Sequence, residues 1–151
     1  MTGVTTLDHV SVTVSDLERS LPFYRDLLGL EERERHRLEG EGISTMAGKS
    51  DVVLQVVRLA APQTPGILLD LQQYLAPPGS TSNAQLGDVG HAHICFGVTD
   101  IDATCRELRD RGVELVSEPV SFELESGLLK VVFLKDPDGN VLELVEYPHG
   151  G

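Results

Sequence analysis

Apolar and polar residues alternate in two short stretches of the chain. In residues 9–14 every second position is valine, and in residues 93–98 every second position is Ile, Phe or Val. A period of two is typical of a β-strand that packs one face and leaves the other face polar. The polar face of each predicted strand begins with a histidine, His9 in the first stretch and His93 in the second.

The two stretches belong to a longer internal repeat. HVSVTVSDL, residues 9–17, aligns without a gap with HICFGVTDI, residues 93–101. A segment of helical period follows each copy and ends at a glycine, Gly29 or Gly112, as helices commonly do. This self-similarity predicts two copies of one supersecondary unit, each unable to bury its apolar face alone.

Capping residues and a proline determine where the predicted helices start. Asp16 and Asp100 stand where N-cap residues are expected. Pro22 would be unfavourable in a helix interior. We therefore expect the first regular helix to begin near Ser20, with the proline in its first turn.

Strand-like runs follow each predicted helix, and a strong turn signal at Asp136–Asn140 separates the last two runs. A loop is expected at residues 60–65, and the stretch 76–90 is rich in Pro, Gly, Ser and Asn, which is typical of a linker. The chain is thus predicted to be a single α+β domain of two β-α-β-β-β modules, at about residues 5–75 and 91–148. The predicted later strands are residues 31–38, 52–59, 66–72, 113–116, 128–134 and 141–147.

Composition limits the partners of the protein. Its 151 residues, 40% of them hydrophobic, suffice for one buried core. Twelve basic residues stand against 24 acidic ones, which gives a net charge of −12. Such a surface repels phosphate backbones and anionic lipid, and no apolar run approaches the length of a membrane span. Neither nucleic acid nor a membrane is an expected partner.

The two cysteines indicate the compartment. Cys95 and Cys105 form no CxxC pair and no disulfide framework, which is typical of reduced thiols in the cytosol. The first ten residues have neither the basic start nor the apolar core of a secretory signal. A cytoplasmic location is therefore expected.

Each half also places one carboxylate between two leucines of its last predicted strand, Asp70 in the first half and Glu143 in the second. If the halves are related by a pseudo-twofold axis, these two carboxylates and the imidazoles of His9 and His93 meet in one cleft. Mixed imidazole and carboxylate donors suit one divalent ion, which can be Zn, Ni, Co, Mn or Fe. The alternative is that the two carboxylates simply lie on exposed strand faces.

Other polar residues share the faces of the predicted ligands. His91 precedes His93 by two residues and is expected at the rim of the cleft rather than in the ligand set. The predicted lining of the substrate pocket is Ser11, Thr13, Gln72 and Cys95, with the thiol lining the pocket rather than binding metal.

Three segments carry a resemblance to a known family: LDHVSVTVSDLERSLPFYRDLLGL at residues 7–30, GHAHICFGVTDI at 90–101 and FLKDPDGNVLELVEY at 133–147. Together with the strand that contains Asp70, they resemble the vicinal oxygen chelate superfamily, also called the glyoxalase/bleomycin resistance/dioxygenase superfamily. The resemblance implies a curved mixed sheet around a metal cleft, a small-molecule substrate and a homodimer.

Position by position, the resemblance implies that His9, His93 and Glu143 are the three most widely shared metal ligands. Asp70 matches the fourth ligand, which is Glu in glyoxalase I-like members and Gln in some epimerase-like members. Aspartate is one methylene shorter than glutamate. Asp70 is therefore expected to bind less closely, to bind through water or to orient a neighbour.

The resemblance leaves more than one reaction open. An isomerase or lyase, like glyoxalase I or methylmalonyl-CoA epimerase, would stabilise an enediolate at the metal while Glu143 or Asp70 moves a proton. For the epimerase version, the predicted strand 52–57 offers no second acid, and Glu123 or Glu125 would have to serve.

Two other functions compete with this one. An extradiol-type dioxygenase would hold Fe(II) with His9, His93 and Glu143, and His91 would be its candidate acid–base residue. A metal-free binding protein, like the bleomycin-resistance members, would typically lack the ligand set and would need more aromatics than the 5% present. We therefore expect a metal-dependent enzyme, best described as an isomerase or lyase acting on a small oxygen-bearing substrate.

Overall fold

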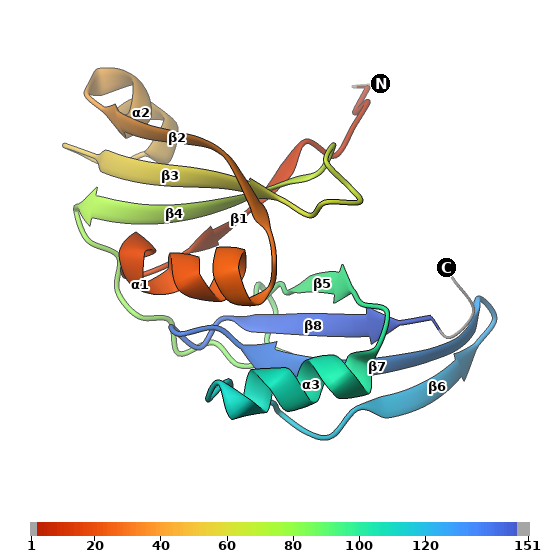
Figure 1. Cartoon of the computed structure of the whole chain (residues 1–151). Helices are drawn as coiled ribbons and strands as arrows, with labels where there is room; N and C mark the ends of the chain where they lie inside the picture. Colours follow the sequence, from red (N-terminus) through yellow and green to blue (C-terminus); the bar gives the residue numbers. More distant parts are fainter. Residues whose placement is uncertain (1–2, 148–151) are drawn as a thin grey trace. The chain divides into compact units, whose positions relative to one another are not determined.

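The computed structural model describes residues 3–147, and the chain forms two compact units that divide between Ser82 and Asn83. Each unit contains one four-stranded sheet and a helical segment after its first strand (Figure 1). The expected α+β class and the repeated β-α-β-β-β order are confirmed. No helix among the described residues is long and apolar enough to cross a membrane.

The first unit is built on a mixed sheet with the strand order β1-β4-β3-β2. β1 runs parallel to β4, and the other neighbouring strands are antiparallel. In chain order the elements are β1 (His9–Thr13), α1 (Leu17–Leu21), the π-helical segment η1 (Pro22–Leu27), β2 (Glu31–Glu39), α2 (Glu41–Ala47), β3 (Val53–Ala60) and β4 (Leu68–Ala76).

The second unit repeats this topology with the strand order β5-β8-β7-β6, again with one parallel pair, β5 and β8. Residues 77–93, between the last strand of the first unit and the first strand of the second, contain no helix or strand. The elements are β5 (Ile94–Gly97), α3 (Ile101–Asp110), β6 (Val120–Leu124), β7 (Gly127–Lys135) and β8 (Val141–Glu146).

One face of each sheet packs against a helix. Tyr24 in η1 is fully buried, as are Leu59 and Leu71 on the first sheet, and Leu108 of α3 and Leu144 of β8 are buried in the second unit. In Figure 1, α1 lies against one face of the first sheet and α3 against one face of the second. Burial of these large side chains is what drives each unit to fold, because about 2 kcal/mol accompanies each.

Aspartates cap both helices as predicted. The Asp16 carboxylate accepts a hydrogen bond from the Glu18 amide at 2.9 Å, and the Asp100 carboxylate accepts one from the Ala103 amide at 2.8 Å. These bonds satisfy amides that have no partner within the helix. The repeat thus extends to the local interactions that start each helix.

The first helix begins earlier than the sequence suggests. It starts at Leu17 rather than near Ser20, so Pro22 lies inside the helical segment and not in its first turn. At the proline the helix widens to π-type spacing, and the Leu28 amide donates to the Phe23 carbonyl at 2.9 Å. A wider turn makes room for the proline ring, which is why the segment continues past it.

Two further elements differ from the prediction. Residues 113–116 do not form a strand but only an isolated bridge between Leu115 and Leu134, and the sheet edge is instead β6. The helix α2 was not predicted, because one glycine and two hydroxyl residues within seven positions, with a further glycine at each end, give little helix propensity. α2 packs Ile43 against Val52, Leu54 and Val56 and so covers one end of the remaining face of the first sheet.

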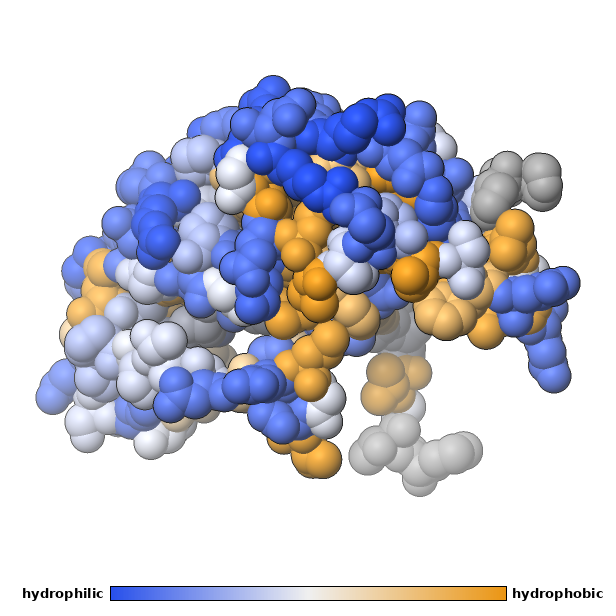
Figure 2. Space-filling model, turned by 90° about the horizontal axis from the view of Figure 1, so that it is seen from below, coloured by the Kyte–Doolittle hydropathy of each residue, from blue (hydrophilic) through white to orange (hydrophobic). Residues whose placement is uncertain are grey.

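The surface is mainly hydrophilic but carries exposed apolar side chains. Figure 2 shows orange, hydrophobic residues between blue, hydrophilic ones on the side that it presents. The edge strand β6 of the second unit has three exposed apolar side chains, Val120, Phe122 and Leu124, each about half exposed. Their alternation with Ser121 and Glu123 is the period-two pattern of a strand.

Candidate metal centre

The first unit brings His9 and Asp70 together on the sheet face opposite α1. β1 and β4 pair in parallel so that Ser11 lies beside Asp70, and His9 lies one pleat earlier on the same side. His9 Nε2 is 3.7 Å from Asp70 Oδ2. The Asp70 side chain is only 8% exposed, so its charge needs a partner inside the protein.

That partner is Arg58 of β3. Arg58 lies directly across the antiparallel pair from Asp70. Its Nε and Nη2 donate to Oδ1 and Oδ2 of the carboxylate at 2.9 Å and 3.2 Å. Hydrogen bonding to Asp70 is the main cause of the raised pKa of the Arg58 guanidinium, against burial, which lowers it.

Sequence reasoning did not identify Arg58. The residue is the only charged one in the mainly apolar run LQVVRLA, and this was an available signal. An arginine in the middle of a central strand needs a carboxylate on the neighbouring strand at the same height. Asp70 is the residue that meets this need.

His9 is oriented from its other side. Its Nδ1 lies 2.7 Å from Asp8 Oδ2, and the hydrogen bond to His9 is the main cause of the lowered pKa of Asp8. An imidazole that donates from Nδ1 keeps the lone pair of Nε2 available, which is the arrangement common among metal-binding histidines.

The second unit brings His93 and Glu143 closer together than the first pair. His93 directly precedes β5, Glu143 lies on β8, and His93 Nε2 is 2.9 Å from Glu143 Oε2. Phe133, directly across from Glu143 on β7, packs edge-to-face on the imidazole with ring centres 5.0 Å apart. The Glu143 side chain remains 20% exposed and accessible to a small molecule.

Cys95 lies beside this second pair. It is opposite Glu143 in the β5–β8 register. Burial, followed by the charge of Glu143 and a hydrogen bond to it, raises the pKa of Cys95 to about 11. At neutral pH the thiol is therefore protonated in the protein without metal.

The separations within the pairs test whether they fit a metal ion. Two ligand atoms at about 2.1 Å from one ion, at angles of roughly 90 to 110°, lie about 3.0 to 3.4 Å apart. His93 and Glu143, at 2.9 Å, are hydrogen-bonded and lie just below this range, so a small separation of the two side chains would admit an ion. His9 and Asp70, at 3.7 Å, are wider, and both oxygens of Asp70 already accept hydrogen bonds from Arg58.

Each unit taken alone supplies two donors. Among residues 3–147, no group of three or more His, Cys, Asp or Glu side chains is placed so that it could hold a metal ion. The predicted set of His9, Asp70, His93 and Glu143 therefore stands as two pairs, at equivalent positions of the repeat.

The other predicted residues lie next to these pairs. On the first sheet Gln72 Nε2 donates to Thr13 Oγ1 at 3.0 Å, on the same face as Ser11 and Asp70. His91 lies in the segment before β5, and its Nε2 is buried without a hydrogen-bond partner among the described residues. Glu123 lies in β6 and is exposed.

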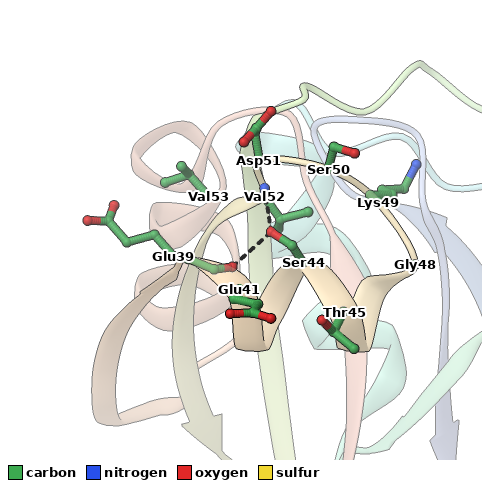
Figure 3. Close-up of a pocket in the computed structure, with 11 residues that line it drawn as sticks. Glu39, Glu41, Ser44, Thr45, Gly48, Lys49, Ser50, Asp51, Val52 and Val53 are labelled. Atoms are coloured by element: carbon green, nitrogen blue, oxygen red, sulfur yellow. Dashed lines mark hydrogen bonds between the residues drawn. The ribbon is translucent and has the colours of Figure 1, made fainter.

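A hollow in the first unit lies around α2 instead (Figure 3). Glu39, Glu41, Lys49 and Asp51 are among the residues that line it. Ser44 Oγ accepts a hydrogen bond from the Val52 amide at 3.0 Å. None of the predicted site residues lines it. It offers no imidazole or thiol, so it is not a second candidate for the metal.

Comparison with known proteins relates the whole arrangement to a family. The model of the Glyoxalase/Bleomycin resistance protein/Dioxygenase superfamily matches residues 6–144. A probable lactoylglutathione lyase of Synechocystis is 30% identical over 139 residues, which are 91% of this chain and 92% of that protein. A 2-epi-5-epi-valiolone epimerase of Actinomyces is 29% identical over 154 residues, 98% of this chain and 82% of that protein.

A solved structure is similar in fold. The crystal structure of a glyoxalase family protein from Bacillus cereus superposes with a TM-score of 0.84 at 24% identity, over 96% of this chain and 95% of that chain. This similarity concerns the fold, whereas the relatives named above by reaction are a lyase and an epimerase.

Proposed function

Because the chain belongs to the glyoxalase/bleomycin resistance protein/dioxygenase superfamily, we propose that it is a divalent-metal-dependent lyase or isomerase acting on a small oxygen-bearing organic substrate. The observation that carries the proposal is the pair His93–Glu143, whose imidazole nitrogen and carboxylate oxygen are hydrogen-bonded at 2.9 Å, slightly closer than two ligands of one ion would be. The relatives named as a lyase and an epimerase support this reaction class.

His9, His93 and Glu143 are the proposed ligands of one Zn, Ni, Co, Mn or Fe ion. Imidazole nitrogen and carboxylate oxygen suit all of these metals, so the donor set does not choose among them. When bound, the metal supplies Lewis-acid stabilisation of the negative charge that develops on the substrate oxygens. Asp8 keeps Nε2 of His9 available for this role.

Proton transfer is assigned to Glu143 rather than to Asp70. Glu143 is one-fifth exposed, and its neighbours His93 and Cys95 can each donate a hydrogen bond to its carboxylate. Asp70 is less exposed, and both of its oxygens accept hydrogen bonds from Arg58, so they are less available to take a proton from a substrate. Ser11, Thr13, Gln72 and Cys95 are the proposed pocket-lining residues.

One observation favours a second function. If Asp70 stays with Arg58, the remaining donors are two histidines and one carboxylate, which is the set typical of Fe(II) oxygenases. The metal that the protein binds therefore separates an extradiol-type dioxygenase from a lyase or isomerase.

The test is elemental analysis of untagged protein purified without chelator. We expect about one metal ion per chain, and His93→Ala or Glu143→Gln to lose it while His36→Ala, a control histidine on β2, retains it. Nickel, cobalt or zinc would support the lyase or isomerase, and iron would support the dioxygenase. Failure of the wild-type protein to bind any of these ions, even on reconstitution, would overturn the proposal in favour of a metal-free binding protein.

A further inference from the structure

We infer that Arg58 withholds Asp70 from the metal, so that the first unit contributes His9 as its single ligand and the Asp70–Arg58 ion pair as a neighbour of the ion. Arg58 is then a positioning residue that sets the number of protein ligands. The inference rests on the proposed metal binding and goes beyond it, because it concerns which carboxylates take part.

The geometry of the ion pair uses both oxygens of Asp70. Arg58 Nε and Nη2 donate to Oδ1 and Oδ2 at 2.9 Å and 3.2 Å, a two-point contact that fixes the plane of the carboxylate. A ligand oxygen must come within about 2.2 Å of the ion. Asp70 would have to give up part of this contact to reach such a position.

Comparison of the two units identifies what differs. Arg58 faces Asp70 across β3 and β4, and Phe133 faces Glu143 across β7 and β8. The two positions are equivalent in the repeat, but one holds a cation and the other a phenyl ring. The ring packs on His93 and cannot hydrogen-bond the carboxylate oxygens. Glu143 therefore bonds its histidine instead, with Oε2 2.9 Å from His93 Nε2. In the first unit the carboxylate turns to Arg58, and the corresponding distance is 3.7 Å.

Side-chain length and burial act in the same direction. Aspartate is one methylene shorter than glutamate, so Asp70 reaches less far from its strand. Its side chain is 8% exposed, against 26% for Arg58, so the carboxylate is the more buried partner of the ion pair. Breaking a buried, hydrogen-bonded ion pair leaves an uncompensated charge, which is costly. The favourable state keeps Asp70 with Arg58.

The test is the affinity of the whole protein for Co²⁺, measured by competition titration and by the visible absorption of the bound ion. Asp70→Asn is expected to change the Kd less than about threefold, because Asp70 neither binds the ion nor hydrogen-bonds a ligand. Glu143→Gln is the matched comparison and is expected to weaken binding far more. The absorption spectrum should be unchanged by Asp70→Asn and altered by Glu143→Gln.

Arg58→Met tests the arginine itself. It frees the carboxylate, so Co²⁺ should bind about tenfold more tightly, within the range by which groups near a metal tune its affinity. The double variant Arg58→Met/Asp70→Asn should lose this gain. If Arg58→Met does not fold, the Co²⁺ affinity of Asp70→Asn still decides whether Asp70 is a ligand.

The outcomes separate the two proposals. A wild-type protein without Co²⁺ affinity overturns the proposed function, and this inference with it. Binding by the wild-type protein that Asp70→Asn weakens as strongly as Glu143→Gln overturns this inference alone and makes Asp70 a full ligand. An Arg58→Met protein that binds Co²⁺ no more tightly than the wild type also overturns it.

Discussion

Asp8 is an exposed residue whose carboxylate is hydrogen-bonded to His9, one ligand of the proposed metal site. Its carboxylate lies 2.7 Å from Nδ1 of that histidine. Asp8→Asn should therefore weaken Co²⁺ binding by about tenfold, as the loss of an orienting partner of a metal-binding histidine commonly does. The measurement is the same titration, with Asp26→Asn, an exposed aspartate paired with Arg25, as the control. Equal affinity of Asp8→Asn and the control would remove Asp8 from the site.

Cys95 gives a prediction about pH. Its pKa is raised to about 11, so the reactive thiolate is scarce at neutral pH and increases as the pH rises toward that value. In a Cys105→Ala background, iodoacetamide should modify Cys95 slowly at neutral pH and faster with each pH step. Glu143→Gln should move the profile to lower pH, because the carboxylate charge is one cause of the raised pKa.

The profile of an ordinary thiol would contradict this picture. Half-maximal modification near pH 8.5 would mean that Cys95 is neither desolvated nor influenced by Glu143. An unchanged profile in Glu143→Gln would leave burial as the only cause of the raised pKa of Cys95.

At the residue scale, sequence patterns found the histidines and carboxylates but not their partners. His9 and His93 follow from the repeat, and Asp70 and Glu143 stand out as acids between leucines. Arg58 pairs with Asp70 through the antiparallel register of β3 and β4, a contact between residues twelve positions apart. Register depends on where strands begin and turns close, which periodicity does not determine.

At the scale of the elements, the contribution of the two N-cap aspartates to stability can be measured. Asp16→Ala and Asp100→Ala should each lower the free energy of unfolding by about 1 kcal/mol, the usual effect of losing an N-cap. Urea denaturation measures this change. Asp110→Ala, at the C-terminal end of α3, is the control and should be neutral or slightly stabilising, because a carboxylate is unfavourable there. Equal effects at all three positions would mean that the caps contribute nothing specific.

Elements were predictable where the hydrophobic period agreed with the capping and turn residues at their ends. The first strand of each unit, α3 and the turn at Asp136 were foreseen, and the Gly139 amide closes that turn on the Asp136 carbonyl at 3.0 Å. The start of α1 was not, because the prediction gave Pro22 more weight than the cap at Asp16. β6 was missed although its apolar residues alternate with polar ones, because the strand at this point of the repeat was assigned to residues 113–116.

At the scale of the whole molecule, the repeat is what made the fold predictable from one sequence. Two copies of the same strand–helix pattern imply two copies of one sheet, and each unit has the same strand order and one parallel pair. The chemistry was less predictable, because equivalent positions carry different residues. Arg58 and Phe133 give the two imidazole–carboxylate pairs different electrostatic surroundings on the same backbone plan.

Metal binding should also change the stability of the whole chain. A ligand that binds only the folded state stabilises it by about 2.7 kcal/mol when present at a hundred times its Kd. Wild-type protein should therefore unfold at a lower temperature after dialysis against a chelator than after reconstitution with Co²⁺. Glu143→Gln should show no such difference, because it lacks a ligand, whereas Asp70→Asn should keep the wild-type difference. Scanning calorimetry of the three proteins measures this directly. A metal-dependent shift that persists in Glu143→Gln would mean that the ion binds elsewhere on the protein. The net charge of −12 would attract a cation to such a place.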